Sequence, residues 1–289
     1  MNAKFILLTP VYKDWKNLEK LLAKINVLFL KKLKSNFDLI IIDDCSNEKV
    51  NLRKFKFSKI NKINVIKLNN NLGSQRAIAM GLKYVQKFYL KNYKLIIMDS
   101  DGQDNPNGIL KMITKSKDFD SSVVARRGQR KEDLWFKMFY EVYCFFIFFF
   151  TFKKLRYGNF CVLKNTDVQK ILKDKNLWSA FPPTLSINIK NIRSVTINRE
   201  KRFSGNSKVN FGGLFFHALK VFSVLRYRII FTSLLYLLIS YFTLFNNFFL
   251  FLMIIIIPIF VLNLSNFTMS FYNKDNLIKN FKKIKVIKF

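Results

Sequence analysis

Residues 96–106 read IIMDSDGQDNP, an apolar run that ends in three carboxylates within six residues. The whole chain has only 18 Asp and Glu against 50 Lys and Arg, so such a dense acidic cluster calls for an explanation. A short apolar run of this kind is typical of a strand buried in a parallel sheet. In open α/β sheets, ligands bind at the carboxyl ends of such strands. The stretch therefore predicts both a fold and the position of a site.

Strand and helix patterns alternate over the first 130 residues. Short apolar or β-branched runs predict four strands, at residues 5–8, 39–42, 65–68 and 95–98. Apolar residues at helical spacing follow Asp14, an expected N-cap, and follow Gly73. This alternation predicts an α/β fold, a Rossmann-like and mostly parallel sheet with helices on both sides.

The predicted strands are followed by four polar loops, which a parallel sheet brings to one edge. The loops are residues 9–12, 43–46, 69–73 and 99–101. Two of them are acidic, and gathered like charges repel unless a cation or hydrogen-bond donors are present. Carboxylate oxygens suit Mg²⁺ or Mn²⁺, which also bind substrate phosphates. We therefore expect a divalent metal bound to a diphosphate.

A purely structural interpretation of the acidic loops is the alternative. Asp at a strand end is often a turn former or a helix N-cap, and residues 104–106 fit the start of a helix. However, neighbouring Asp43 and Asp44 have no structural need to be doubly acidic, and Gly73 lets the backbone approach a ligand closely. These features favour a ligand site.

The formal net charge of +32 indicates an anionic partner, and a general bias toward Lys, Asn, Ile and Phe is the alternative explanation of the lysine excess. Nucleic acid, an anionic membrane face and phosphorylated substrates are the candidates. The sequence has no basic stripe interleaved with aromatic residues, as nucleic-acid modules have. We therefore expect membrane lipids and phosphorylated substrates, and no nucleic acid. Three widely spaced cysteines fit a reducing compartment.

Residues 229–265 contain no charged side chain. A single helix of this length would extend roughly 55 Å, against a hydrocarbon core about 30 Å thick. Two spans that turn at Asn246 and Asn247 fit better, although each is short enough to leave a re-entrant hairpin open. Basic residues flank both ends, which places both flanks in the cytoplasm. The expected localisation is the membrane, with the site on the cytoplasmic face.

The order of several motifs resembles family 2 nucleotide-sugar glycosyltransferases with a GT-A fold. The motifs are TPVY, IIDDCS, NNLGSQRAIAMG and MDSDGQDNP. The later segments VVARRGQRKEDLWFKMFY, YGNFCVLK and REKRFSGNSK resemble the polyprenyl-phosphate branch, which includes dolichol-phosphate mannose and undecaprenyl-phosphate glucose synthases. The resemblance extends over about residues 4–265. A Q-x-x-R-W segment is absent from the sequence, so we do not expect a processive polysaccharide synthase.

The resemblance implies roles for individual residues. Asp99, Asp101 and Gln103 match a D-x-D-x-Q motif that holds Mg²⁺ or Mn²⁺ and the donor diphosphate. The donor site would include Pro10, Tyr12, Asp14, Asp43 and Asp44. Residues implied near the phosphates and the acceptor are Arg126, Arg202 and Lys208, and Asp104 matches an acidic position of some members. Arg76, which follows Gly73, either contacts the diphosphate or is solvated.

The residue patterns and the resemblance together predict an organisation in four parts. A cytoplasmic GT-A domain would cover residues 1–210, an amphipathic juxtamembrane helix 211–228, a transmembrane hairpin 229–265 and a basic cytoplasmic tail 266–289. The apolar segment 134–152 predicts either an interfacial helix or a buried core helix.

The expected reaction is attack of an acceptor oxygen on the anomeric carbon of a nucleotide sugar, with inversion and loss of the nucleoside diphosphate. A lipid phosphate is already anionic and needs no base, whereas a glycan hydroxyl needs a carboxylate such as Asp104. Gly102 stands where the family usually has Leu, and such departures leave the acceptor less defined than the donor. A non-catalytic, lipid-binding protein is the alternative from another class. The sugar, the nucleotide and the oligomeric state, including a homo-oligomer, stay open.

Overall fold

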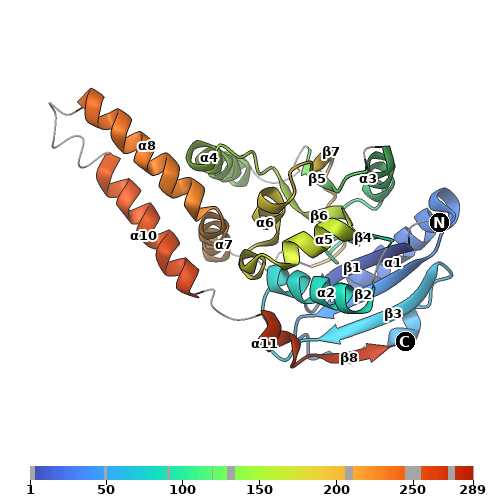
Figure 1. Ribbon diagram of the computed structural model, residues 1–289. Coiled ribbons are helices and arrows are strands. Elements are labelled where there is room, and N and C mark those ends of the chain that lie inside the picture. Colours follow the sequence, from blue (N-terminus) through green and yellow to red (C-terminus); the bar gives the residue numbers. More distant parts are fainter. Residues whose placement is uncertain are drawn as a thin grey trace. The chain divides into compact units, whose positions relative to one another are not determined.

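The computed structural model describes residues 4–48, 51–89, 92–118, 120–128, 134–205, 211–244, 255–272 and 277–288. These residues form two compact units (Figure 1). The first unit comprises Met1–Glu132, Arg156–Ser207 and Asn276–Phe289, and the second comprises Asp133–Leu155 and Lys208–Asp275. The chain therefore leaves the first unit at two places to build the second.

An eight-stranded sheet in the order β7-β5-β6-β4-β1-β2-β3-β8 forms the first unit. Its strands are β1 (Lys4–Val11), β2 (Phe37–Asp43), β3 (Ile60–Lys67), β4 (Tyr93–Ile97), β5 (Val123–Arg127), β6 (Tyr157–Lys164), β7 (Arg193–Ile197) and β8 (Lys285–Lys288). Neighbours pair in parallel except at β6 and β8, which run antiparallel to the strands beside them. The predicted mostly parallel α/β sheet is confirmed.

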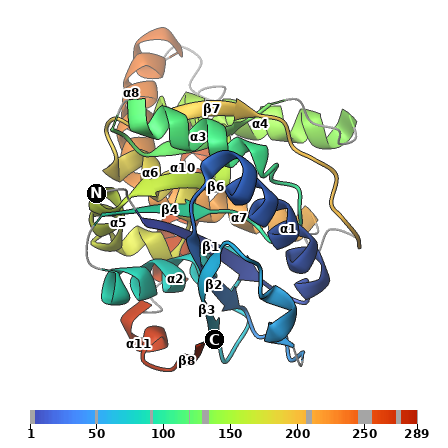
Figure 2. The ribbon, with the colours of Figure 1, turned by 90° about the vertical axis from the view of Figure 1, so that its right-hand side faces the viewer.

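Helices cover both faces of this sheet (Figure 2). One face carries α1 (Trp15–Leu28) and α3 (Asn107–Asp118), and the other carries α2 (Ser74–Phe88), α5 (Asn165–Leu172) and α6 (Phe181–Asn188). The short helices are η1 (Phe29–Leu33), η2 (Leu52–Phe55) and η3 (Lys175–Trp178). The sequence of β2 is almost continuously apolar because both faces of the strand are buried. Ile40 packs into one hydrophobic cluster and Ile41 into the other. Burial of each such side chain contributes about 1.5–3 kcal/mol.

The C-terminal segment departs from the expectation of a basic tail. Residues 277–281 form the helix α11, and β8 pairs antiparallel with β3 at the sheet edge. Val286 packs against one hydrophobic cluster and Ile287 against the other, so the alternation that buries a strand is present in KVIK. The flanking lysines of this edge strand disfavour further strand pairing.

The second unit consists of helices in the described part of the chain. They are α4 (Leu134–Thr151), α7 (Phe211–Val224), α8 (Arg226–Leu244) and α10 (Ile257–Tyr272). Phe149 of α4 stacks on Tyr236 of α8 with 4.6 Å between ring centroids. Asn263 of α10 donates to Ser233 of α8 over 3.1 Å. Aromatic stacking and polar contacts therefore join these helices.

Many large apolar side chains of these helices are exposed. Phe242 is 77% exposed, Tyr227 72% and Phe231 69% on α8, and Phe260 is 65% exposed on α10. On α4, Ile147 is buried while the neighbouring phenylalanines are exposed, so α4 has one packed and one uncovered face. Such a concentration of exposed apolar groups is unusual for a soluble monomer and marks an interaction surface.

The predicted transmembrane hairpin of residues 229–265 is not clearly present. Among the described residues, no single helix has both the length and the apolar character needed to cross a membrane; by these criteria Gly212–Val224 and Arg226–Phe242 qualify only together, with a bend of 81°. Helix α10 has 16 residues and would extend only about 24 Å. The expected juxtamembrane helix ends at Val224, and the expected turn at Asn246 lies outside the described residues.

Candidate active site

The polar loops after β1, β2, β3 and β4 meet at one edge of the sheet, as predicted. The four strands are neighbours in the order β4-β1-β2-β3 and all run in parallel. Backbone hydrogen bonds continue the ladder into the loops, with Asp44 N donating to Val11 O over 2.8 Å and Leu68 N donating to Asp43 O over 2.9 Å. The loops are thus fixed relative to one another by the sheet itself.

The carboxylates after β2 are buried and bind backbone amides. Asp43 accepts from Ser46 N over 2.9 Å. Asp44 accepts from Leu72 N over 2.7 Å with one oxygen and from Gly73 N over 2.9 Å with the other. Burial raises the pKa of Asp44 above its usual value, and these two backbone donors act in the opposite direction. Asp44 therefore holds the loop after β3, a role that sequence reasoning did not give it.

The remaining donor-loop residues lie around this edge. Pro10 is buried at the end of β1, and Tyr12 is half-buried in the loop that follows. Gly73 has a φ of +84° at the start of α2, a left-handed conformation that side chains other than glycine rarely adopt. The Arg76 guanidinium lies 5.2 Å above the Trp178 ring, and Nε donates to Trp178 O over 3.4 Å. Arg76 thus packs α2 against η3.

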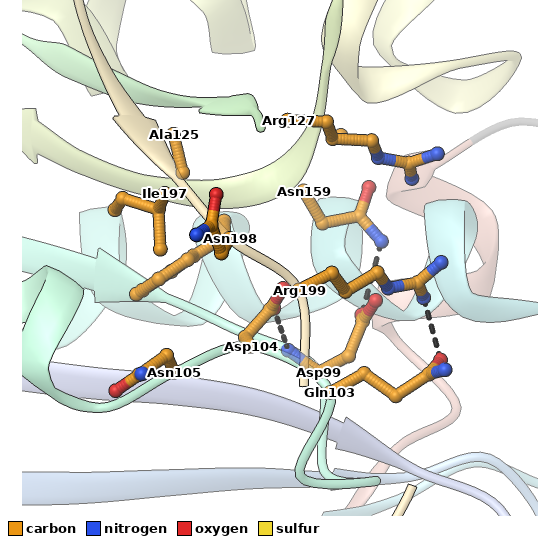
Figure 3. A pocket seen from close by; sticks show the side chains of 12 residues that line it. Asp99, Gln103, Asp104, Asn105, Ala125, Arg127, Asn159, Ile197, Asn198 and Arg199 are labelled. Carbon is orange, nitrogen blue, oxygen red and sulfur yellow. Dashed lines mark hydrogen bonds between the residues drawn. The ribbon is translucent and has the colours of Figure 1, made fainter. Parts of the chain in front are cut away.

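The loop after β4 folds back on itself (Figure 3). Asp104 accepts from Asp99 N over 3.1 Å, and Asp101 accepts from Gln103 N over 3.0 Å. Asn159, at the start of β6, donates to Asp99 Oδ1 over 3.0 Å. The two acidic groups Asp99 and Asp104 are therefore held beside each other.

This crowding changes the acidity of the loop. Burial, and then the charge of Asp101, raise the pKa of Asp99 above its usual value. Burial, and then the charge of Asp99, raise the pKa of Asp104 to about 7. Both shifts mean that the site favours neutral carboxyls unless positive charge is added. A divalent cation supplies such charge, so the electrostatics of the loop fit one.

The ligand set for such a cation is small. In the described ranges, no three His, Cys, Asp or Glu side chains are arranged to ligate a metal ion. Mg²⁺ usually takes one or two protein carboxylates and completes its shell with water and substrate phosphates. Asp99 and Asp101 fit that requirement. The amide oxygen of Gln103 instead accepts from Arg199 Nη2 over 2.6 Å, so this structure gives Gln103 a different partner.

A segment from Arg199 to Gly205 runs beside the acidic loop. Arg202 forms ion pairs with Asp14 over 2.5 Å and with Asp101 over 3.2 Å, and it thereby joins the first and fourth loops. The backbone of the segment also pairs with the loop, since Phe203 N donates to Asp101 O over 3.2 Å. Arginine therefore faces carboxylate at the point where a phosphate would need positive charge.

Gly102 is explained by the same segment. Its φ is +82°, and a Cβ at this position would lie 2.3 Å from the Phe203 ring. The ring and the positive φ therefore both require glycine where the family usually has Leu. Phe203 in turn lies under Lys24, whose Nζ is 4.5 Å from the ring centroid.

A pocket opens beside the acidic loop (Figure 3). It is lined by Asp99, Gln103, Asp104, Asn105, Ala125, Arg127, Gly158, Asn159, Phe160, Ile197, Asn198 and Arg199. The predicted Arg126 is not part of this lining and is exposed, because successive residues of β5 point to opposite faces and Arg127 takes the pocket face. Lys208, also predicted, lies outside the described residues.

Sequence reasoning missed several polar residues of this pocket, including Arg127, Asn159 and Arg199. Arg127 is one position from the predicted Arg126, and only the alternation of side chains along β5 distinguishes the two. Asn159 lies in YGNF, and Arg199 lies in the basic segment before Lys208. Each stands inside a motif that carries the family resemblance, but no residue pattern shows which side chains face the acidic loop.

Comparison with known proteins gives related sequences. The model of glycosyl transferase family 2 matches residues 6–175. An uncharacterized glycosyltransferase of Synechocystis is 27% identical over 236 residues, which are 76% of this chain and 68% of that protein. The uncharacterized glycosyltransferase YkcC of Bacillus subtilis is 28% identical over 145 residues, 48% of this chain and 43% of YkcC. The chain thus spans about two thirds of the first relative and less than half of the second.

Solved structures share the fold. TarS of S. aureus, determined with UDP-GlcNAc, has a TM-score of 0.52 at 14% identity, over 80% of this chain and 69% of TarS. Glucosyl-3-phosphoglycerate synthase of Mycobacterium tuberculosis, determined with Mn²⁺, UDP and glucosyl-3-phosphoglycerate, has a TM-score of 0.54 at 12% identity, over 78% and 80% of the two chains. At these identities the likeness shows the fold, a GT-A-like α/β domain.

Proposed function

This chain belongs to glycosyl transferase family 2, and from that premise we propose that it transfers a sugar, with inversion at the anomeric carbon, from a nucleotide sugar to a polyprenyl phosphate in a membrane. The proposal depends on one observation, the meeting of three carboxylates with arginines at the carboxyl edge of the sheet. These residues are Asp99, Asp101, Asp104, Arg127, Arg199 and Arg202.

The donor is expected beside the loops after β1, β2 and β4. The fold neighbours TarS and glucosyl-3-phosphoglycerate synthase were determined with UDP-GlcNAc and UDP, which supports a nucleotide-sugar donor here. Asp14 and Asp101 come from two of these loops, and both pair with Arg202. A diphosphate that entered between them would meet a guanidinium that is already held in position.

Asp99 and Asp101 would hold Mg²⁺ or Mn²⁺, and such an ion supplies Lewis-acid stabilisation of the charge that develops on the leaving diphosphate. Arg202 at Asp101 and Arg199 at Gln103 add fixed positive charge beside the loop. Because their hydrogen bonds hold them before the reaction begins, they need little reorganisation while charge develops. The residues of this chain thus orient the donor and stabilise the leaving group.

The chemistry of the second unit supports a lipid acceptor. Its helices expose aromatic and aliphatic side chains, and basic residues such as Lys154 and Arg226 lie among them. A surface with apolar bulk and positive charge suits an anionic membrane interface. A polyprenyl phosphate found there is already ionised, so its attack requires no general base.

A hydroxyl acceptor on a lipid-linked glycan is the second candidate, and one observation favours it. Asp104 has a pKa of about 7 and lines the pocket, and a general base works best when its pKa is near the working pH. Asp104→Asn distinguishes the two acceptors. This change leaves transfer to a phosphate largely intact, whereas it strongly impairs transfer to a hydroxyl.

The test uses the full chain, purified and placed in vesicles that contain a polyprenyl phosphate. A panel of nucleotide sugars is added with Mg²⁺ or Mn²⁺, and the lipid fraction is analysed by mass spectrometry. We expect one sugar on the lipid phosphate, and no product with Asp101→Ala. Product only on added glycan hydroxyls would contradict the polyprenyl-phosphate assignment. Absence of transfer from every nucleotide sugar to both acceptors would contradict the proposed function as a whole.

A further inference from the structure

A continuous chain of amide groups connects the acidic loop with the start of α6. Phe181 N donates to Gln75 Oε1 over 2.8 Å. Gln75 Nε2 donates to Asn159 Oδ1 over 2.8 Å, and Asn159 Nδ2 donates to Asp99 Oδ1 over 3.0 Å. The four groups come from α6, α2, β6 and the loop after β4, so one path of hydrogen bonds links four elements.

Both ends of this path are chemically fixed. The backbone N–H of Phe181 can only donate, and it is the first N–H of α6, which has no carbonyl partner within its own helix. When a cation is bound, the Asp99 carboxylate is ionised and can only accept. A side-chain amide turned the wrong way would place two acceptors or two donors against each other. The ends therefore dictate the orientation of both amides between them.

We propose that Gln75 and Asn159 are positioning residues for the glycosyl transfer reaction, which transmit the direction of the Phe181 N–H to Asp99 and keep an N–H donor on its carboxylate. This role rests on the proposed function, in which Asp99 holds the cation and the donor. The path leaves the second oxygen of Asp99 available for that ligand.

The base of the path is held firmly. Arg76 packs on Trp178 next to Gln75, and Phe181 and Trp178 are both buried in the hydrophobic cluster under α2. A site residue keeps its geometry when the residues behind it are locked by packing and hydrogen bonds. Gln75 therefore acts on the loop of Asp99 through Asn159.

Gln75→Glu replaces the amide by a carboxylate of nearly the same shape, and it thereby reverses the donors and acceptors along the path. A carboxylate at position 75 accepts from Phe181 N and also presents an acceptor to Asn159. Asn159 must then turn and face Asp99 with its oxygen. A lost charge-assisted hydrogen bond corresponds to roughly a ten-fold loss of affinity. We expect about this loss in binding of Mn²⁺ in the presence of UDP, measured as the electron paramagnetic resonance signal of free Mn²⁺.

The decisive readout is the dependence of one substitution on the other. In an Asn159→Leu background the path is already cut, so Gln75→Glu should produce no further loss. If Gln75 had only a local structural role, Gln75→Glu would cost the same in both backgrounds, and this result would overturn the proposal. Gln86→Glu is the matched control, because it makes the same change on the same helix at a residue that accepts from Lys83 over 2.8 Å and lies outside the path.

A second readout is made with Mn²⁺ but without a nucleotide, and it separates this inference from the proposed sugar transfer. In Asp99→Asn the last group is an amide that can turn, so Gln75→Glu should lower the thermal unfolding midpoint much less there than in the natural chain. Purely additive shifts would overturn the path, whether or not the protein binds a donor. Absence of sugar transfer by the natural chain, with coupled midpoints in Mn²⁺, would overturn the proposed function and leave the path standing. If Gln75→Glu does not fold, Gln75→Leu replaces it in the Mn²⁺-binding cycle, with the same expectation.

Discussion

Two loops of this molecule carry paired carboxylates, and they use them in opposite ways. Asp44, after β2, gives both oxygens to backbone N–H groups of the next loop. Asp101, after β4, turns one oxygen to its own loop and the other to the Arg202 side chain. Both loops have the same chemistry in the sequence. What differs is the partner, since backbone donors are part of the fold whereas a charged side chain can exchange its partner for a ligand.

The largest effect is expected at the second loop. Asp101→Asn removes a charge on which the cation and Arg202 depend, and it should lower the rate of sugar transfer by about 10²- to 10³-fold. The thermal unfolding midpoint should change little, because the amide still accepts from Gln103 N. The two quantities are measured on the same preparation. A rate within a few-fold of the natural chain would break the contrast between the loops.

The second loop should also give stability a strong dependence on pH. The pKa of Asp104 is about 7 in the fold and near 3.8 in the unfolded chain, so between pH 4 and pH 7 the folded state holds a proton that the unfolded state has lost. The free energy of unfolding must then fall as the pH rises through this window. Asp104→Asn should therefore raise the free energy of unfolding at pH 7 by an amount on the order of 3 kcal/mol.

This prediction is checked by urea unfolding in EDTA at pH 4 and pH 7. The natural chain and Asp104→Asn should have similar stability at pH 4, and the variant should be more stable at pH 7. Equal stability of the two proteins at both pH values would show that burial and neighbouring charges do not raise the pKa of Asp104.

The first loop should respond in stability rather than in chemistry. Asp44→Asn places an NH₂ group against the backbone donors of Leu72 and Gly73, and an unsatisfied buried group costs about 1–3 kcal/mol of unfolding free energy. Urea unfolding measures this loss. At saturating donor the transfer rate should stay within about three-fold of that of the natural chain. Loss of a contact made in the transition state would lower it by about 10²-fold or more. A large loss of rate with unchanged stability would reverse the roles given to the loops.

The smallest effect is expected at Arg202. Lysine keeps the charge but lacks the planar fork that reaches Asp14 and Asp101 together. Arg202→Lys should raise the KM for the donor about ten-fold, with a smaller change in kcat. Steady-state kinetics over a donor titration give both constants. An unchanged KM would show that bridging of the two loops does not contribute to donor binding.

Sequence reasoning reached the sheet and its acidic edge because both depend on local patterns. The four predicted strands lie in β1 to β4, although β3 ends at Lys67 and β4 ends at Ile97, one residue before the predicted limits. The convergence of their loops follows from parallel topology alone. The element types of the N-terminal half were therefore readable without a structure.

The remaining features depend on register and on contacts between distant segments. Arg127 faces the pocket rather than Arg126 because side chains alternate along β5, and the sequence alone does not show which of the two faces the acidic loop. Asn159 reaches Asp99 only because β6 runs antiparallel beside β4. The edge strand β8 pairs with a strand more than 200 residues earlier, and four residues rich in lysine gave no sign of it.

The central claim is that the carboxylates of the second loop hold a divalent cation together with the donor diphosphate. Calorimetric titration of UDP into the natural chain, once with Mn²⁺ and once with EDTA, tests it most directly. We predict binding in Mn²⁺ that is lost in EDTA. Binding of UDP with the same affinity in EDTA would contradict the claim.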